Sequence, residues 1–308
     1  MNIIEQAAKR LEELQRAGVA VPWAAAGFEA SPPAVTPNPA PASSGVGAAL
    51  LHQASTEPPP PADAAPVPAR VSRQVMIDIQ RLIDMGFVVP GGPRSPTADE
   101  YRVIKRPLLK NATMTGEAAV RRGNLIQVVS AMPGEGKTFT AVNLALSIAA
   151  ELDHSVLLVD ADVVRPSVFP RLGLSAERGL LDLLRDPSVS LPDVMLSTNV
   201  PKLSLLPAGT ASADSTELLA SAAMERLLDD LATRYADRIV IFDSPPVLAA
   251  TEARVLATKV GQVLVVIEAG NTSRELVTEA FGALSSCPVV MAVLNKYDGP
   301  PLAGPYGY

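Results

Sequence analysis

The sequence predicts an α/β fold in which a mainly parallel, twisted sheet is flanked by helices. Short apolar runs alternate with amphipathic segments from residue 97 to residue 296, which is typical of strand–helix–strand units. A glycine-rich loop follows the first run, and two later runs end in aspartate. Ligands of open α/β sheets bind at the carboxyl ends of the strands, where these polar residues fall.

The predicted strands are apolar runs that a parallel sheet would bury on both faces. They are Leu125–Ser130, Val156–Asp160, Leu203–Leu206, Ile239–Asp243, Val263–Ile267 and Val289–Leu294. The predicted helices lie near residues 138–150, 216–234, 250–258 and 272–285. Together these elements predict one domain over residues 97–296.

Upstream of this domain, composition separates three segments. Apolar residues at helical spacing predict an amphipathic helix over residues 1–18, which we expect to dock on a core or a partner helix. Its acidic and basic residues balance, so membrane binding is the weaker alternative. Residues 31–68 hold 11 of the 29 prolines, so residues 19–70 are predicted to be a disordered linker rich in proline and alanine. A short helix and a connector are expected over residues 71–96.

Composition also limits what the chain can bind. A net charge of −6 and a pI near 5.1 argue against a nucleic-acid partner. A single cysteine, Cys287, excludes an internal disulfide, and two histidines, His52 and His154, make a zinc site improbable. No apolar run is long enough to span a bilayer as a helix. We therefore expect a cytoplasmic protein without a membrane span.

Residues 130–138, Ser-Ala-Met-Pro-Gly-Glu-Gly-Lys-Thr, have the pattern of a phosphate-binding loop, with Ala131 in place of the usual first glycine. Gly134 and Gly136 let backbone N–H groups converge on phosphate oxygens at a helix N-terminus. Lys137 would reach the β- and γ-phosphates, and the Thr138 hydroxyl would bind Mg²⁺. The loop predicts a P-loop NTPase that binds a nucleotide and Mg²⁺. The expected nucleotide-binding residues here are Pro133, Gly134, Glu135, Gly136, Lys137, Thr138 and Phe139.

Three aspartates end two of the predicted strands. Asp160 and Asp162 follow one strand, and Asp243 ends another in the manner of a Walker B strand. Mg²⁺ keeps several waters and takes one or two carboxylates, so it suits such a site. We expect Thr138, Asp160 and Asp243 to hold the metal.

Combined, these motifs resemble the bacterial tyrosine autokinases (BY-kinases) of capsule and exopolysaccharide biosynthesis, most closely the cytoplasmic branch encoded with exosortases. The likeness covers about residues 99–295. It rests on the loop with its internal Pro133, on Asp160-Ala161-Asp162 followed by Arg165-Pro166, and on Asp243-Ser244-Pro245-Pro246. Residues 206–209 and 216–219 are similar to the stretches between these motifs in the family.

The resemblance implies a reaction, partners and further residues. It implies transfer of the γ-phosphoryl group of ATP to tyrosine, with Lys137, Asp160 and Asp162 as catalytic residues, and Asn295 in contact with adenine. Residues 99–105 resemble a helix that joins subunits into a ring, with Asp99, Arg102 and Lys105 at the matching positions. A membrane polysaccharide co-polymerase is the implied activator, which would hold the protein at the periphery of the inner membrane.

The C-terminal segment supplies candidate phosphate acceptors. Residues 297–308 contain Tyr297, Tyr306 and Tyr308 among glycines and prolines that prevent regular structure. We expect a flexible tail whose phenols are phosphorylated in cis or by a neighbouring subunit.

Three other functions fit parts of the sequence. A ParA- or MinD-like ATPase switch shares the motif of Asp160 and Asp162 but needs a lysine where Met132 stands. A GTPase is suggested by the N-K-x-D pattern of residues 295–298, yet the D-x-x-G motif that a GTPase needs soon after the phosphate-binding loop is missing. A non-catalytic, ATP-sensing adaptor of a polysaccharide export complex would bind ATP without phosphorylating tyrosine.

Overall fold

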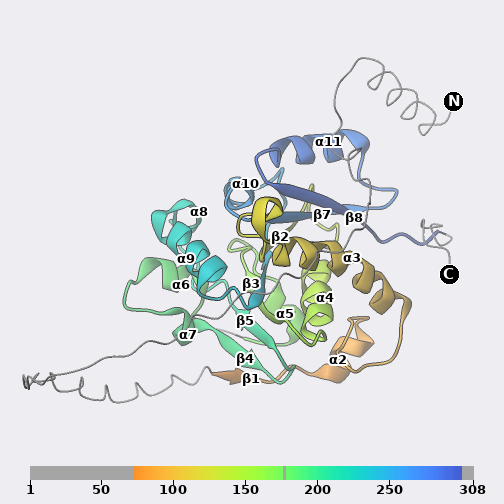
Figure 1. Ribbon diagram of the computed structural model, residues 1–308, viewed down its shortest axis with the longest axis horizontal. Helices are drawn as coiled ribbons and strands as arrows, with labels where there is room; N and C mark the ends of the chain where they lie inside the picture. Colours follow the sequence, from red (N-terminus) through yellow and green to blue (C-terminus); the bar gives the residue numbers. More distant parts are fainter. Residues whose placement is uncertain (1–72, 176–177, 300–308) are drawn as a thin grey trace, which may run out of the picture. The chain divides into compact units, whose positions relative to one another are not determined.

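The computed structural model describes residues 73–175 and 178–299 (Figure 1). The predicted helix over residues 1–18, the linker over residues 19–70 and the tyrosines at 306 and 308 lie outside these residues. The boundaries of the predicted segments therefore stay predictions.

A single eight-stranded sheet forms the centre of the described part, in the order β1-β4-β5-β3-β6-β2-β7-β8. Six strands, from β5 to β8 in that order, are parallel, whereas β4 runs antiparallel to β5 and β1 pairs parallel with β4. The strands are β1 (Gln74–Val75), β2 (Leu125–Ser130), β3 (Ser155–Asp160), β4 (Leu196–Thr198), β5 (Leu203–Leu206), β6 (Arg238–Asp243), β7 (Gln262–Glu268) and β8 (Val289–Asn295). The predicted mainly parallel sheet is confirmed.

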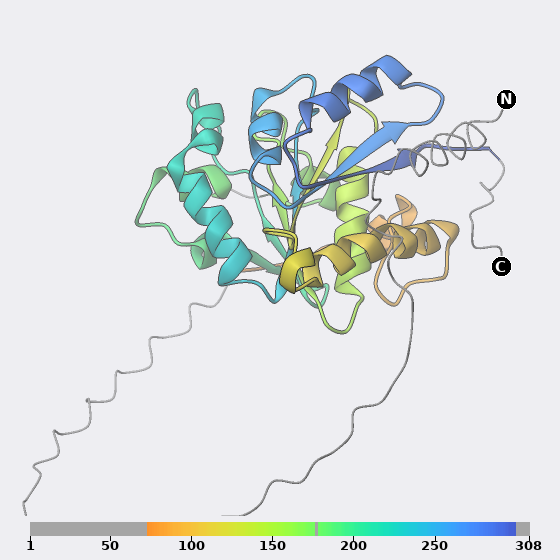
Figure 2. The ribbon, with the colours of Figure 1, turned by 45° about the horizontal axis from the view of Figure 1, so that its top comes forward.

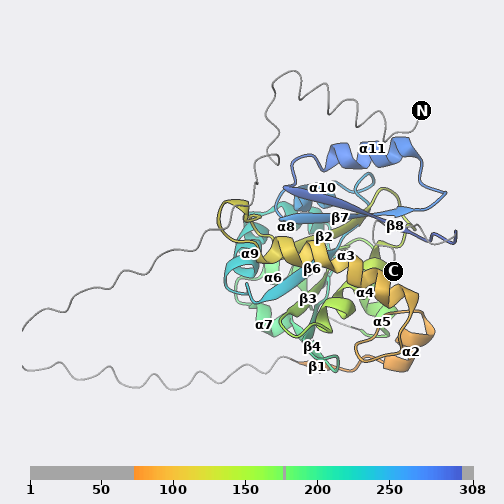
Figure 3. The same ribbon diagram turned by 45° about the vertical axis from the view of Figure 1, so that its right-hand side comes forward.

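Helices cover both faces of this sheet (Figures 1 and 3). One face packs against α2 (Ile79–Asp84), α3 (Pro96–Thr113), α4 (Lys137–Ala149) and α5 (Val168–Leu172). The other packs against α6 (Leu180–Arg185), α7 (Leu191–Val194), α8 (Ser215–Ala220), α9 (Ala222–Thr233), α10 (Thr251–Ala257) and α11 (Arg274–Ala283). Figure 2 shows α11 lying over the strands at the blue edge of the sheet, β7 and β8.

Alternation of side chains explains why the central strands are apolar throughout. In β2, Leu125 and Val129 enter the core beneath α6–α11, whereas Ile126 and Val128 enter the core beneath α2–α5. All four are fully buried, and burying such a side chain stabilises the fold by about 1.5–3 kcal/mol.

The helix predicted over residues 216–234 is divided in two, which corrects that prediction. Ser221 adopts an extended backbone and begins α9, and its hydroxyl accepts a hydrogen bond from the Met224 N–H. A serine side chain satisfies a free N–H at a helix start, so it favours a new helix over continuation. The sequence also did not predict the short elements β1, β4 and α5–α7.

Helix α3 differs from the expectation that the resemblance gave for residues 99–105. Asp99 and Arg102 are exposed and pair with each other at 2.5 Å. Lys105 is buried, and its ammonium donates to the Ser147 carbonyl at 2.6 Å and pairs with Glu151 at 2.5 Å. Lys105 therefore fastens α3 to α4 within one chain and is not free for another subunit.

Candidate active site

The phosphate-binding loop joins β2 to α4 at the centre of the sheet. Gly134 and Gly136 have φ angles of +92° and +102°, a backbone region that other residues rarely adopt. At Gly136 an added Cβ would also lie 2.0 Å from the Asn295 amide nitrogen, so the Asn295 side chain would have to leave its position. The two glycines are thus required by the shape of the loop.

Strand order brings the predicted aspartates beside this loop. Because β6 lies between β3 and β2, Asp160 and Asp243 are direct neighbours in register, and Val128 of β2 is the next partner of Asp243. These residues lie at or near the carboxyl ends of their strands, as expected for an open α/β sheet.

Asp160 and Asp243 are fully buried and poorly satisfied. One oxygen of Asp160 accepts a hydrogen bond from the Val168 N–H at 3.1 Å, while its other oxygen and both oxygens of Asp243 have no partner in the described part of the chain. Burial raises the pKa of Asp160 to about 8, and the nearby charge of Asp243 adds to the rise. Burial also raises the pKa of Asp243 to about 7, opposed by the Thr138 hydroxyl and the Lys137 ammonium.

This pair fits a divalent cation. Buried carboxylate oxygens without partners are costly unless a proton or a cation compensates them. The Thr138 hydroxyl lies near Asp243 and is 2.8 Å from the Ser167 hydroxyl. Within residues 73–175 and 178–299, no group of three or more Asp, Glu, His or Cys could hold a metal. Two carboxylates and a hydroxyl suit Mg²⁺, which takes one or two carboxylates and completes its shell with waters and phosphate oxygens.

The two groups expected to act on the reacting phosphate meet in one cavity. The Lys137 ammonium lies 3.4 Å from an Asp162 carboxylate oxygen, and both side chains are largely buried. The other oxygen of Asp162 accepts from the Arg165 N–H at 3.0 Å. Lys137, Thr138 and Asp162 line a cavity of about 470 Å³, whereas Asp160 lies beneath it in the sheet.

Asn295, the last residue of β8, and Lys296, which follows it, are hydrogen-bonded to the phosphate-binding loop. The Asn295 side-chain amide donates to the Glu135 carbonyl, and the Lys296 ammonium donates to the Gly134 carbonyl, both at 2.8 Å. Lys296 also pairs with Glu268 at 3.1 Å. Asn295 is thus beside the loop, where the resemblance expects a contact to adenine, and its second amide hydrogen and its oxygen remain for a ligand.

Two of the side chains expected to bind the nucleotide, Glu135 and Phe139, turn away from the cavity. The Glu135 carboxylate is buried and accepts from the Met132 N–H at 2.8 Å and from the Thr272 hydroxyl. The Phe139 ring packs on Phe87 with centroids 4.9 Å apart. Only the backbone of these two positions can face a nucleotide, whereas Pro133 lines the cavity.

Sequence reasoning missed several residues of the cavity. Arg171, Ser167 and Glu252 line it together with Arg165, although none of the first three belongs to a motif used in the sequence analysis. Glu252 at the start of α10 is 8% exposed. No local pattern marks these residues, because α5 and α10 reach the cavity only through the fold. Tyr297 is 42% exposed and follows Lys296 directly.

Known proteins match this chain over the segment that contains the phosphate-binding loop. The AAA domain family matches residues 123–283. Tyrosine-protein kinase YwqD of Bacillus subtilis is 32% identical over 205 residues, which cover 66% of this chain and 82% of the relative. The putative tyrosine-protein kinase EpsB of Ralstonia nicotianae is 34% identical over 218 residues, which cover 70% of this chain but only 27% of EpsB.

Solved structures give the same result. The kinase domain of VpsO matches with a TM-score of 0.55 and 31% identity, covering 65% of this chain and 96% of that domain. The kinase domain of the Escherichia coli tyrosine kinase ETK matches with a TM-score of 0.55 and 25% identity, covering 77% and 95%. No helix in the described residues is long and apolar enough to cross a membrane. From its phosphate-binding loop, its paired aspartates and these relatives, the chain belongs to the family of bacterial tyrosine-protein kinases and contains an AAA domain.

Proposed function

We propose that this protein is an ATP-dependent tyrosine kinase that phosphorylates tyrosines of its own C-terminal segment and thereby regulates exopolysaccharide synthesis or export. The observation that carries the proposal is the meeting of Lys137, Thr138 and Asp162 in one cavity above the buried pair Asp160 and Asp243. A phosphoryl transfer requires such a combination of cations, metal ligands and an acceptor-side carboxylate.

ATP and Mg²⁺ would be held by the loop and the strand ends. Backbone N–H groups of residues 133–138 would bind phosphate oxygens, and Lys137 would leave Asp162 to neutralise the γ-phosphate. Mg²⁺ would be held by Thr138, Asp243 and Asp160 and would neutralise charge on the β- and γ-phosphates. Asn295 lies beside Gly136 and is the proposed contact to adenine.

In the proposed reaction, the bond between the γ-phosphorus and the bridging oxygen of ATP breaks, and a bond to the tyrosine oxygen forms. The phenolic proton passes to a carboxylate, for which Asp162 is better placed than Asp160 because it lines the cavity. A free phenol has a pKa about 6 above that of a carboxylic acid, so the carboxylate acts mainly by orienting the hydroxyl until late in the transfer. ADP and phosphotyrosine are the products.

The acceptors would be Tyr297, Tyr306 and Tyr308. Each phosphate adds a charge of about −1.5 to −2, which would repel the tail from an acidic protein and loosen an assembly of subunits. Assembly as a homo-oligomeric ring is part of this proposal. A membrane polysaccharide co-polymerase would recruit the protein to the inner membrane and activate it. The name of one relative, the succinoglycan biosynthesis transport protein ExoP of Rhizobium meliloti, supports the link to polysaccharide export.

The test replaces Lys137 by methionine in the full chain. We expect Lys137→Met to lose nearly all phosphotyrosine formed with ATP and Mg²⁺, since the cation that neutralises the transferring group is gone. Mass spectrometry of the tail would identify the modified tyrosines. Lys110→Met, an exposed lysine of α3, is the matched control and should retain wild-type activity.

Two outcomes would reject the proposal. Phosphotyrosine that persists in Lys137→Met would show that another site carries the activity. ATP binding by the wild type, without phosphotyrosine under any condition including the presence of the co-polymerase, would indicate the alternative: an adaptor or a ParA- or MinD-like ATPase switch.

A further inference from the structure

The catalytic cavity extends beyond the phosphate-binding loop and has two chemically different walls. One wall comes from the β3–α5 loop and α5 and carries Arg165 and Arg171. The second wall comes from the segment between β6 and α10. It is apolar and consists of Pro245, Pro246, Ala249 and Ala250.

The two arginines are without close partners. Both are exposed, and neither guanidinium makes a hydrogen bond or an ion pair with another residue in the described ranges 73–175 and 178–299, although the charge of Arg171 lowers the pKa of the buried Asp243. The other cation of the cavity, Lys137, lies 3.4 Å from Asp162 and in the proposed reaction neutralises the γ-phosphate of ATP, so it is not available to an acceptor peptide. An arginine that is not used within its own chain can bind a carboxylate of a ligand through two parallel hydrogen bonds.

The acidic groups of the cavity restrict where an anionic ligand can lie. Asp162 accepts a hydrogen bond from the Arg165 N–H and is the proposed acceptor of the phenolic proton, so its charge faces the tyrosine hydroxyl. Glu252 is 8% exposed, lines the cavity beside the apolar wall and has no hydrogen-bond or ion-pair partner among the described residues. Its charge repels a carboxylate from that wall, so the arginine wall is the favourable place for one.

We propose that this outer part of the cavity is the acceptor subsite and that Arg165 and Arg171 select tyrosines followed by an acidic residue. The inference rests on the proposed kinase function. The phenol ring packs on the wall of Pro245, Pro246, Ala249 and Ala250, and the next side chain of the substrate reaches the guanidinium groups. Arg165 and Arg171 are then specificity-determining residues rather than catalytic ones.

The chain carries a sequence of this kind. Tyr297 is followed by Asp298, whereas Tyr306 is followed by glycine. Tyr297 and Asp298 are both exposed. The proposal therefore predicts that Tyr297 of one copy is a better substrate than Tyr306 for the cavity of another copy.

The test measures kcat/KM of the full chain, with ATP and Mg²⁺, on three peptides in which the tyrosine is followed by aspartate, asparagine or lysine. An exposed charge pair contributes about 1 kcal/mol, so we expect about a fivefold preference for aspartate over asparagine and a further loss with lysine. The double variant R165E/R171E should reverse this order and favour lysine. Because reversal is a gain of activity on one peptide, misfolding cannot produce it. Arg94→Glu, an exposed arginine before α3 that does not line the cavity, should keep the wild-type order.

The outcomes separate the two proposals. Equal rates on the three peptides, or a uniform loss on all of them in R165E/R171E, would overturn the acceptor inference and leave the kinase function intact. A uniform loss would assign the arginines to the phosphoryl group itself. If no peptide and no tail tyrosine is phosphorylated, the kinase function fails, and the inference fails with it.

Discussion

At the scale of single residues, Asp160 and Asp243 lower the stability of the metal-free fold, because three of their four carboxyl oxygens are buried without a partner in the described part of the chain. Burial raises the pKa of both carboxyls; the charge of Asp243 adds to the rise at Asp160, and the charge of Asp162 adds to the rise at Asp243. In the metal-free protein the fold therefore favours their protonated forms. For an acid whose pKa is higher in the folded state, stability is present at low pH and is lost as pH rises towards the folded pKa. Here the loss extends from about pH 4, the usual value for aspartate, to about pH 7–8.

This cost predicts the behaviour of Asp243→Asn. Without metal, the variant should be at least as stable as the wild type above pH 7, because it removes a buried group that must ionise. The same variant should lose the dependence of nucleotide binding on Mg²⁺. Thermal unfolding at pH 8 and calorimetry of nucleotide binding with and without Mg²⁺ would measure the two effects.

The control is Asp237→Asn, a residue whose side chain is 71% exposed at the opposite end of β6. Asp237→Asn should change neither the thermal stability at pH 8 nor the dependence of nucleotide binding on Mg²⁺. If Asp243→Asn unfolds well below the wild type at pH 8 without metal, the carboxylate has a structural role and the interpretation is wrong.

At the scale of elements, α3 is held to α4 by a buried ammonium group. The Lys105 ammonium donates a hydrogen bond to the Ser147 carbonyl near the end of α4 and forms an ion pair with Glu151 just beyond that end. A cation at a helix C-terminus also interacts favourably with the helix dipole. The packing of Tyr101 and Leu108 on either side of Lys105 completes the contact.

Replacing Lys105 should therefore affect stability within one subunit. We expect Lys105→Met to lower the free energy of unfolding by about 1–3 kcal/mol, because the Ser147 carbonyl loses a buried partner. Arg102→Met, which breaks an exposed pair on the same helix, should change it by about 0–1 kcal/mol. Denaturant unfolding would compare the two variants. Light scattering should find the same oligomeric state in Lys105→Met and in the wild type, and a change of state at unaltered stability would contradict this role.

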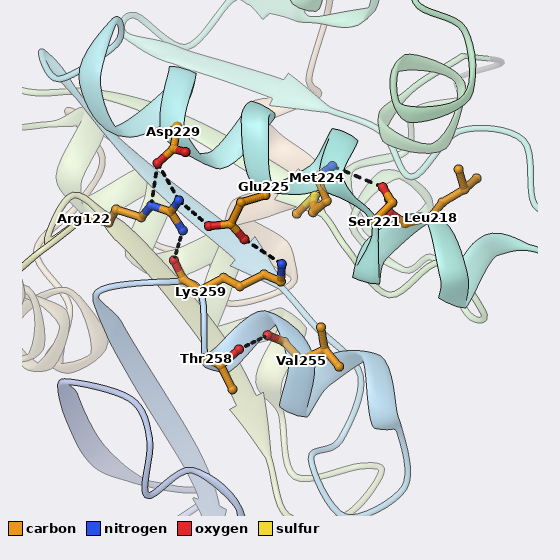
Figure 4. Close-up of polar contacts among 9 residues, drawn as sticks. All are labelled: Arg122, Leu218, Ser221, Met224, Glu225, Asp229, Val255, Thr258 and Lys259. Carbon is orange, nitrogen blue, oxygen red and sulfur yellow. Dashed lines mark hydrogen bonds and ion pairs between the residues drawn. The ribbon is translucent and has the colours of Figure 1, made fainter.

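At the scale of the whole described domain, one arginine joins parts of the chain that are far apart in sequence (Figure 4). Arg122 precedes β2, and its side chain is 4% exposed. It pairs with Glu225 and Asp229 of α9 and donates to the Lys259 carbonyl after α10. Lys259 closes the cluster through Glu225 at 2.6 Å. The cluster lies at the start of β2, and the phosphate-binding loop lies at the other end of the strand.

The cluster gives the stability a defined acid dependence. The Lys259 ammonium and the Arg122 guanidinium lower the pKa of Glu225 to about 2. Since this folded pKa lies below that of a free glutamate, the contribution is complete above about pH 5 and is lost as pH falls towards 2. Glu225→Gln should therefore be less stable than the wild type at pH 7, by about 1 kcal/mol because solvent screens the pair.

Unfolding in denaturant between pH 7 and pH 3 would measure this difference, which should shrink as the pH falls. Glu217→Gln, at an exposed position of α8 without an ion pair in the described part of the chain, is the control and should stay close to the wild type in stability. A deficit in Glu225→Gln that stays constant down to pH 3 would mean that the side chain acts by packing.

The central strands, the glycine-rich loop and the acidic strand ends could all be predicted from the sequence. Each is a local pattern with a local cause: apolar runs that must be buried, glycines that adopt positive φ, and carboxylates that end strands. The sequence could not determine which strands are neighbours, because pairing depends on the whole chain. Only the tertiary structure placed Asp160 against Asp243, turned Lys105 inward, and brought Arg171 and Glu252 to the cavity. Such contacts join residues far apart in sequence, and no spacing along the chain records them.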